Sequence, residues 1–415
     1  MSSTLPPRTS DGQQARAPDP SGSDTPPAGE RPDLGHLDAA VRERYSEGAG
    51  RAVPELCCPV DYQPELLEVI PDEVIARDYG CGNPSRHLAP GETVLDLGSG
   101  TGKICFIASQ VVGPGGRVIG VDMNEDMLDV ARRAAPVVAG RIGHDNVTFL
   151  RGRIEDLATD VEAVDARLAE TPLRSGADLS AFETWSSDLR ARSPLIHDDS
   201  VDVVVSNCVL NLVVPSAKQR LFAEIFRVLR RGGRAVISDI VSDEAVPASM
   251  VADPELWSGC ISGALREQDF LTAFERAGFH GIRILERAEQ PWQVVEGIEF
   301  RSLTVEAFKG KQGPCFEQNQ AVIYTGPWKR VEDDDGHVLE RGQRMAVCGK
   351  THGLMTQAPY ADQIVGVEPL EPIDESEAQP FACDGTRKRH PRETKGTDYD
   401  ADIAPDGECC EPGAC

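Results

Sequence analysis

The sequence predicts an α/β protein built on a doubly wound, mostly parallel sheet, followed by a small β-rich C-terminal domain. Short apolar runs alternate with helical segments over residues 94–240, and strands separated by helices form parallel sheets. The first run ends in a glycine-rich turn, LDLGSGTG at 95–102. From residue 311 onward, short apolar runs are separated by Gly, Pro and a DDDG turn, which is typical of a β-rich region.

The bulk composition narrows the class of protein. The 415 residues suffice for two or three domains. The formal net charge of −26 argues against nucleic acid or an anionic membrane as a partner. No stretch reaches the ~20 apolar residues of a membrane span, and the N-terminus has no apolar core of a secretory signal. We therefore expect a cytoplasmic protein whose 12 cysteines are reduced thiols.

Five strands are expected in the sheet. Each is a short apolar run bounded by turn residues or helices, and the fourth is β-branched in its middle, as a strand buried on both faces should be. They are TVLDL (93–97), RVIGVD (117–122), NVTFLRG (146–152), VDVVVSN (201–207) and RAVISDI (234–240).

The helices between these strands follow from caps and apolar faces. Asn124 is the expected cap of the second helix, with acidic residues in the first turn. The helix of SAKQRLFAEIFRVLRRGG has one apolar face and is expected to stop at its glycines. Residues 158–199 are too long for a plain loop, so DVEAVDARLAE and DLSAFETWSSDLRAR are expected as two inserted helices. The helix EQDFLTAFERAGF follows, and GIRILERA and FRSLTVEAFKG are expected as closing strands.

These elements divide the chain into five regions. Residues 1–40 are rich in Pro, Ser, Gly and Asp and are expected to form a disordered leader. Residues 41–93 form a cap segment, and residues 94–290 form the sheet domain. The small C-terminal domain covers 291–380, and a disordered tail with four cysteines covers 381–415.

The glycine-rich turn is typical of a nucleotide-like cofactor site. Glycines let the backbone approach a ligand, and the helix that follows offers free N–H groups. Lys103 stands where the nicotinamide fingerprint G-x-G-x-x-G requires a glycine. Asp122 ends the second strand about 20 residues later, where a carboxylate can accept both ribose hydroxyls. A cofactor site is therefore favoured over a turn that only connects a strand to a helix.

Three cysteines are expected to meet at the ligand end of the sheet. Cys208 follows the fourth strand and Cys260 lies in the connection after the fifth, so both lie beyond the carboxyl ends of the strands, where ligands bind. Cys81 can join them only if the segment from about Ala40 folds over the crevice as a lid, and VIPDEVIARDYGCG could supply a helix that delivers it. Three thiols suit a soft centre rather than Mg or Ca. Trivalent arsenic takes three sulfur ligands and keeps a lone pair that can attack a methyl carbon.

Packing is the alternative for any single cysteine, because a free thiol is most often a small buried hydrophobic group. We assign that role to Cys105, Cys315 and Cys348. The tail cysteines Cys409, Cys410 and Cys415 could capture a metalloid or belong to an incidental solvated tail. No resident metal is expected, since the eight histidines show no ligand spacing.

The pattern D-x-G-x-G-x-G followed by GVDMN resembles the class I S-adenosylmethionine-dependent methyltransferases, which have a Rossmann-like fold. The resemblance implies S-adenosyl-L-methionine as cofactor, an acid at the end of the second strand on its ribose, and an acid after the third strand near its adenine. Asn207 is expected at its methionine part, and Asp239 is expected to end the fifth strand at the crevice. The expected cofactor residues are Asp96, Gly98, Gly100, Gly102, Asp122, Met123, Ile154, Glu155 and Asn207.

The contexts YGCG, VSNCVLNLV and WSGCISGAL are similar to those of the arsenite S-adenosylmethionine methyltransferases, and this resemblance covers roughly residues 45–285. It implies that Cys81, Cys208 and Cys260 bind As(III) or a trivalent organoarsenical, which is methylated in arsenic detoxification. It also implies a thiol-exchange cysteine in ELCCPVD, either Cys58 or Cys57, with thioredoxin or glutathione as reductant.

Two other functions stay open. One is a methyltransferase acting on carbon or oxygen of a small metabolite, with cysteines that only pack. The other is a non-catalytic, thiol-rich metalloid-binding protein on a degenerate fold. The intact DLGSGTG and Asp122 argue against the second.

Overall fold

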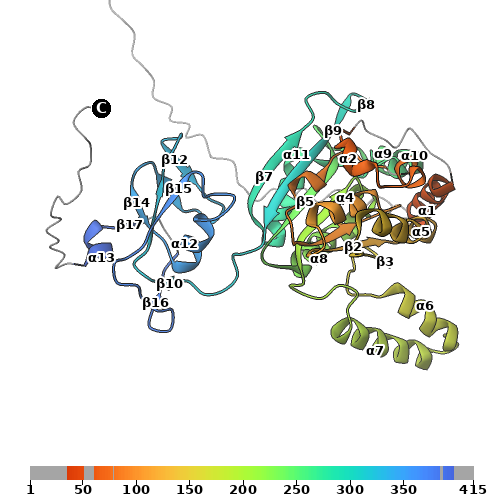
Figure 1. Ribbon diagram of the computed structural model, residues 1–415, viewed down its shortest axis with the longest axis horizontal. Coiled ribbons are helices and arrows are strands. Elements are labelled where there is room, and N and C mark those ends of the chain that lie inside the picture. Colours follow the sequence, from red (N-terminus) through yellow and green to blue (C-terminus); the bar gives the residue numbers. More distant parts are fainter. Residues whose placement is uncertain (1–34, 51–59, 78, 384–386, 397–415) are drawn as a thin grey trace, which may run out of the picture.

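The computed structural model describes residues 35–50, 60–77, 79–383 and 387–396 of the chain. They form a larger α/β part and a smaller β-rich part, which are joined near residue 310 (Figure 1). Among these residues, none of the helices combines the length and the apolar character needed to cross a membrane.

A nine-stranded sheet forms the centre of the larger part. Its main order is β3-β2-β1-β4-β5-β9-β7, while β6 pairs with β5 and β8 with β9. Strands β1 to β5 pair in parallel, and β9 runs antiparallel to both β5 and β7. The predicted doubly wound, mostly parallel sheet is therefore confirmed. The strands are β1 Thr93–Leu97, β2 Arg117–Asp122, β3 Val147–Arg151, β4 Val201–Asn207, β5 Leu229–Ser242, β6 Leu265–Arg266, β7 His280–Arg287, β8 Gln293–Val295 and β9 Ile298–Phe308.

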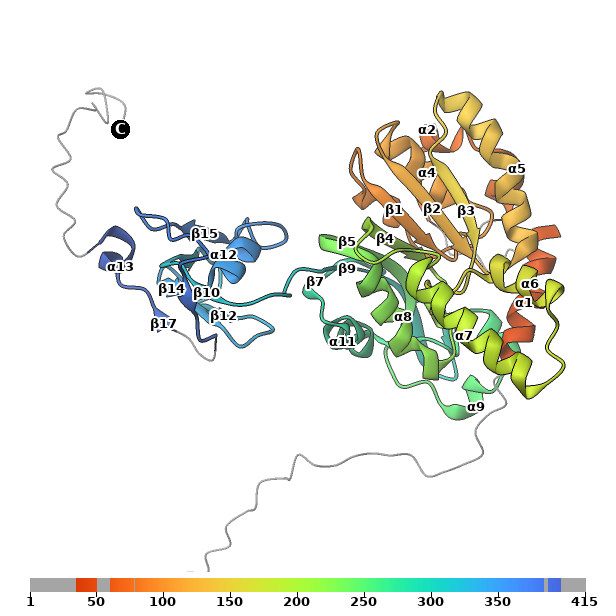
Figure 2. The ribbon, with the colours of Figure 1, turned by 90° about the horizontal axis from the view of Figure 1, so that it is seen from below.

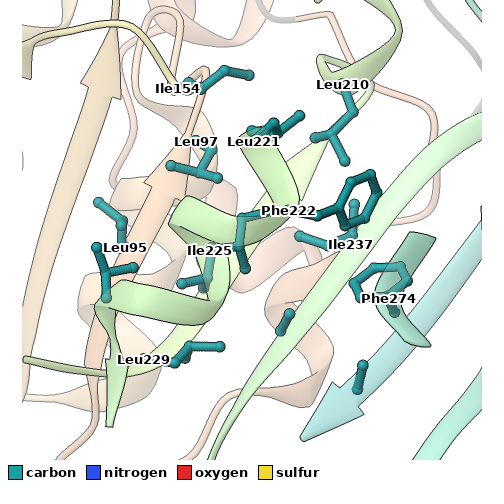
Figure 3. Close-up of a cluster of buried hydrophobic side chains, with 14 of the residues drawn as sticks. Leu95, Leu97, Ile154, Leu210, Leu221, Phe222, Ile225, Leu229, Ile237 and Phe274 are labelled. Atoms are coloured by element: carbon teal, nitrogen blue, oxygen red, sulfur yellow. The ribbon is translucent and has the colours of Figure 1, made fainter. Parts of the chain in front are cut away.

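Helices cover both faces of this sheet because successive strand residues point to opposite sides. Val94 of β1 packs in the cluster under α4 (Lys103–Val112) and α5 (Glu125–Ile142). Its neighbour Leu95 packs in the cluster under α8 (Pro215–Val228) and α11 (Glu267–Ala277). Figure 3 shows the second cluster, in which the apolar face of α8 lies over the sheet.

The two inserted helices, α6 (Val161–Glu170) and α7 (Gly176–Arg192), project away from the sheet (Figure 1). In the view from below they lie in front of the larger part (Figure 2). Neither carries a buried residue. Ion pairs tie them to the body, such as Arg190 to Asp156 at 2.5 Å. The insertion therefore adds surface rather than core.

The N-terminal segment lies across the carboxyl end of the sheet. Helix α1 (Gly35–Gly50) runs beside α10 (Pro254–Ser258) and α5, and Arg44 donates a hydrogen bond to the Glu255 carbonyl at 3.1 Å. The expected leader of 1–40 is therefore too long, because the helix begins at Gly35; residues 1–34 lie outside the described residues. The segment continues with α2 (Pro64–Leu67), α3 (Asp72–Ala76) and the 3₁₀ helix Pro84–His87.

Two predicted ends along the fifth strand are wrong. Helix α8 ends at Val228, and β5 begins directly at Leu229, before the glycines that were expected to stop the helix. The Gly232 N–H donates a hydrogen bond to the Lys309 carbonyl at 2.7 Å, so this glycine takes part in strand pairing. The pairing of β5 with β4 shifts register between Leu229 and Arg234, so the glycines lie in an irregular stretch of the strand. Because β9 pairs along β5 as far as Ser242, Asp239 lies inside the strand and does not end it.

The smaller part is β-rich, as predicted. A sheet of order β15-β11-β14-β17 packs on a small core that includes Tyr324 and Met345, and two further strand pairs flank it. Its elements are β10 Phe316–Glu317, β11 Ala321–Tyr324, β12 Arg330–Glu332, β13 Val338–Glu340, β14 Arg344–Ala346, α12 Gly349–Met355, β15 Ile364–Val367, β16 Gln379–Pro380, β17 Arg387–Lys388 and α13 Pro391–Lys395.

The expected limits of this part need two corrections. Strands β8 and β9 belong to the large sheet, so the small part begins near residue 311 and not at 291. The tail was expected to be disordered from 381, but β17 pairs with β14 and Arg389 is buried between Glu317 and Glu393, at 2.6 and 2.8 Å. The cysteines at 409, 410 and 415 lie outside the described residues.

Candidate functional site

A crevice opens at the carboxyl ends of β1, β2 and β4, with an empty volume of about 1140 Å³ including its mouth. Helix α1 contributes Val41, Arg42 and Tyr45 to its wall. Eight of the nine expected cofactor residues line it, namely Asp96, Gly98, Gly100, Asp122, Met123, Ile154, Glu155 and Asn207. Gly102 does not: it caps α4 with a φ of 90°, and a Cβ there would lie 2.6 Å from Phe149. This glycine is needed for packing under the turn.

Asp122 fixes the glycine turn at the wall of the crevice. The carboxylate accepts the Gly100 N–H and the Asn124 N–H, each at 2.8 Å. Burial raises the pKa of Asp122, and the hydrogen bonds from these backbone groups act in the opposite direction. Ser99 Oγ, at the same turn, is buried without a hydrogen-bond partner among the described residues. A buried hydroxyl without a partner at a crevice wall is suited to a polar ligand.

Cys81, Cys208 and Cys260 come together beside this crevice, and each is less than a tenth exposed. The sulfurs of Cys81 and Cys208 and a carboxylate oxygen of Asp239 all lie within 4.8 Å of one another. Cys260 Sγ donates a hydrogen bond to the Cys208 carbonyl at 3.2 Å, and the Cys208 thiol interacts with both other thiols. Cys208 is thus the central member, and it also lines the crevice.

Cys81 reaches this position because Asn207 holds its loop. Asn207 Oδ1 accepts the N–H groups of Cys81 and Gly82 at 2.9 and 3.0 Å, and Nδ2 donates to the Gly82 carbonyl at 2.8 Å. The glycines on either side of Cys81 permit the close approach: a Cβ on Gly80 would lie 2.4 Å from Asn207, and one on Gly82 2.6 Å from Ser238. Asn207 was expected at the cofactor; the structure also makes it the anchor of the Cys81 loop.

The lid over the thiols is helix α1. Tyr45 Oη lies 3.7 Å from Cys260 Sγ, and the Tyr79 hydroxyl donates to the Gly48 carbonyl at 3.2 Å. The helix expected within VIPDEVIARDYGCG exists as α3, but it packs Val74 into the cluster under α4 and ends before the loop that carries Cys81. No pattern in the sequence singles out Tyr45.

Two of the three cysteines have strained backbones. Cys208 and Cys260 have φ values of 65° and 61°, in the left-handed region. This conformation costs a non-glycine residue about 1–3 kcal/mol and is concentrated at functional sites. Asp239 holds the first loop by accepting the Leu210 N–H at 2.8 Å, and Asn211 holds the second by donating to the Cys260 carbonyl at 3.3 Å.

The thiols lie in a buried setting, with the Asp239 carboxylate nearby. Burial raises the pKa of Asp239 to about 6, which still leaves a carboxylate at neutral pH. The pKa of Cys208 lies well above its usual range: the hydrogen bond with Cys260 lowers it, but that with Cys81, together with burial and the Asp239 charge, raises it more. The hydrogen bond with Cys208 and burial likewise raise the pKa of Cys260. Both thiols are therefore neutral at physiological pH.

The other cysteines lie elsewhere. Cys105 is buried in α4 and its Sγ donates to Asp96 at 3.3 Å, in keeping with the packing role expected of it. Cys57 and Cys58 lie outside the described residues. Cys315 and Cys348 belong to the C-terminal part.

Replacing Asn207 with alanine is expected to lower the rate of methyl transfer about 10- to 100-fold. The change leaves the buried N–H groups of Cys81 and Gly82 without their acceptor, which costs about 1–3 kcal/mol for each, so the Cys81 loop moves away from Cys208. The rate is measured as formation of S-adenosylhomocysteine.

Asn146→Ala is the matched control, because Asn146 Nδ2 also ties down a glycine-bearing loop, through the Gly113 and Gly116 carbonyls. That loop precedes β2, so it lies at the amino ends of the parallel strands, opposite the crevice. The control is expected to lose stability but keep its rate. Equal losses of rate in both variants would contradict a specific role for Asn207.

Comparisons with known proteins agree with this fold. Residues 88–278 match a family described as a methyltransferase domain, and residues 311–399 match a domain of unknown function. An arsenite methyltransferase from Aquipseudomonas alcaligenes is 33% identical over 74% of this chain and 82% of its own length. One from Mus musculus is 30% identical over 76% of each chain. The solved arsenic(III) S-adenosylmethionine methyltransferase from Chlamydomonas reinhardtii is 28% identical, with a TM-score of 0.50, over 78% of this chain and 99% of its own.

The sheet order, the glycine turn and these similarities define an S-adenosylmethionine-dependent methyltransferase with the class I fold. S-adenosyl-L-methionine is its cofactor. Within that class, the chain belongs to the arsenite methyltransferase family.

Proposed function

We propose that this enzyme transfers methyl groups from S-adenosylmethionine to As(III) held by Cys81, Cys208 and Cys260. The observation that carries the proposal is the meeting of these three thiols, from segments far apart in the chain, beside the methyltransferase crevice. Thiolates are soft ligands that select thiophilic centres. Asp239, the carboxylate nearest the sulfurs, accepts the Leu210 and Ile240 N–H groups and so serves the loop.

The crevice suits the cofactor through its own polar groups. The Asp122 carboxylate would accept the ribose hydroxyls, and the turn at Gly98 and Gly100 would let the cofactor approach the backbone. Glu155, oriented by Arg153 at 2.6 Å, would lie near the adenine, together with Met123 and Ile154. The Ser99 hydroxyl, which has no hydrogen-bond partner within the described part of the chain, is available to a polar group of the ligand.

The neutral thiols suit a neutral substrate. Arsenous acid, As(OH)₃, exchanges its three hydroxyls for three thiols, and the three thiol protons leave with the hydroxyls as three waters. No net charge then has to be buried in the cluster, where burial already holds the Cys208 and Cys260 thiols protonated. A monomethylated trivalent arsenical would use two of these sulfurs in the same way.

Catalysis by the chain is mainly positioning. When bound, S-adenosylmethionine supplies a methyl group from its sulfonium to the arsenic lone pair, and S-adenosylhomocysteine is left. The strained Cys208 and Cys260 loops fix the sulfurs before the substrate arrives, and α1 with Tyr45 covers them from water. A second hollow borders Cys81 on the side of Arg86, Trp292 and Ser302 and offers the arsenical a way in.

The membership of the family also motivates a wider proposal. We propose that the reaction serves arsenic detoxification in the cytoplasm, and that Cys58 or Cys57 takes part in thiol exchange. Methyl transfer leaves a pentavalent arsenic, whose return to As(III) consumes two thiols and leaves a disulfide. Thioredoxin or glutathione would restore those thiols.

The test is product analysis with a methyl-labelled donor. The full-length enzyme is incubated with As(III), reduced thiol and labelled S-adenosylmethionine, and arsenic species are separated and identified by mass spectrometry. We expect labelled methylarsenicals and matching S-adenosylhomocysteine. A parallel assay supplies a quinone or a phenol as acceptor. Methylation of that acceptor with arsenic left inert would favour a small-metabolite methyltransferase, and As(III) binding without S-adenosylhomocysteine would favour a non-catalytic binder.

A further inference from the structure

A second group of three thiols lies in the C-terminal part. Cys315 precedes β10, Cys348 lies between β14 and α12, and Cys383 follows β16, yet their sulfurs all lie within 4.8 Å of one another. All three are free thiols. The sequence favoured packing for Cys315 and Cys348, and only the fold brings Cys383 to them.

Strand pairing and a helix start build this second group. The Phe381 N–H bonds the Cys315 carbonyl at 2.8 Å, and Phe316 pairs with Pro380, so Cys315 and Cys383 flank neighbouring strands. The Cys348 sulfur is fully buried and accepts the Thr351 N–H at 3.4 Å. The other two cysteines are half-buried, so the group is partly accessible.

The pKa shifts of two thiols in the group run in opposite directions. The pKa of Cys315 is lowered: burial raises it, but hydrogen bonds with Cys383, Cys348 and Lys350 lower it more. Burial, followed by the hydrogen bond with Cys315, raises the pKa of Cys383. The Lys350 ammonium group, which also donates to the Gly313 carbonyl at 2.9 Å, supplies a positive charge beside the sulfurs.

Among the described residues, the donor atoms of this group are three sulfurs. Within the described residues, the group gains no His, Asp or Glu as a fourth ligand inside the same distance. Structural zinc sites are four-coordinate, with a closed shell of protein ligands, so three sulfurs without a fourth ligand among the described residues do not match them. The group matches a soft centre that takes three sulfurs in a pyramid and points its lone pair outward.

We propose that Cys315, Cys348 and Cys383 bind a second As(III) as a trithiolate, apart from the reaction centre. Arsenous acid exchanges three hydroxyls for the three thiols, and the thiol protons leave in three waters. The identity of the ion rests on the proposed function, because As(III) is then the thiophilic ion that this enzyme meets. All three cysteines lie within residues 311–399, the match to a domain of unknown function.

The test counts arsenic on the full-length chain. The reference variant carries Cys208→Ser, which opens the catalytic thiol group, and serines at the three tail cysteines, which lie outside the described residues. After incubation with arsenite and gel filtration, arsenic per chain is measured by mass spectrometry. We expect about one arsenic per chain, falling at least fivefold when Cys383→Ser is added. Cys105→Ala is the matched control, since it removes a buried thiol outside both groups and should leave the count unchanged.

Two further measurements keep the proposal falsifiable if a variant folds poorly. Circular dichroism of each variant checks the fold, and Cys383 is chosen for substitution because it is half-buried. Arsenic X-ray absorption on the reference variant needs no substitution in the second group: three As–S contacts and no As–O contact support the proposal, and retained As–O contacts overturn it. The purified protein is also analysed for zinc. Bound zinc that disappears in the Cys383→Ser variant and that prevents arsenite from binding would overturn the choice of ion.

The outcomes also separate this proposal from the proposed function. If the enzyme methylates As(III) but the amount of bound arsenic does not depend on Cys383, the proposed function stands and the second site is refuted. If the chain binds arsenic through Cys383 but forms no methylarsenical, the second site stands and the proposed function is refuted.

Discussion

Cys208→Ser is expected to lower As(III) methylation at least about 100-fold, since a misplaced substrate alone costs about that much. Cys208 is the central thiol, in contact with both Cys81 and Cys260, and it lines the cofactor crevice. A serine hydroxyl is a hard ligand and cannot replace the sulfur. The rate is measured from labelled methylarsenicals, and S-adenosylmethionine affinity, measured by calorimetry, should change less than about threefold.

Two controls sharpen this result. Cys105→Ser keeps a donor for Asp96 and lies outside the thiol group, so methylation should stay within about threefold of the unmodified enzyme. The second control is Cys208→Gly, because a glycine adopts the left-handed backbone conformation of this position without strain. If the residue served only the backbone, the glycine variant would stay active. Full activity in either Cys208 variant would therefore refute coordination by this sulfur.

Asp122→Ala is expected to weaken S-adenosylmethionine binding about 100-fold. A hydrogen bond to a charged group contributes about 1.5–3 kcal/mol, and each 1.4 kcal/mol is tenfold in affinity. The change also removes the acceptor for the Gly100 and Asn124 N–H groups, which loosens the glycine turn. The dissociation constant is measured by calorimetry on the full-length chain.

The control for this variant is Asp126→Asn, an exposed acid in the first turn of α5, just beyond the crevice. It removes one negative charge four residues further along the chain and should leave cofactor affinity within about twofold. Arsenic binding to the thiols, measured without cofactor, should survive in Asp122→Ala. An affinity for S-adenosylmethionine that falls less than threefold in Asp122→Ala would remove Asp122 from the cofactor site.

The sequence alone determined the sheet domain. Its strands are apolar runs separated by amphipathic helices, and this local pattern is enough to predict parallel pairing. Asn124 was predicted as a cap from its position, and its side chain does accept the Met127 N–H at 3.2 Å. The glycine turn and Asp122 carry a cofactor signature within about 25 consecutive residues, as dinucleotide-type sites do. Each of these features depends on neighbours in the chain.

Only the tertiary structure decided where the thiols meet. Cys81 reaches Cys208 through the side chain of Asn207, and Tyr45 reaches Cys260 because α1 lies across the crevice. The glycines after α8 sit in a strand because β9 pairs alongside, and Cys383 joins Cys315 because two short strands pair. These contacts join residues far apart in sequence, and their energies depend on burial and on backbone partners. A local sequence pattern therefore predicts neither the burial nor the backbone partners.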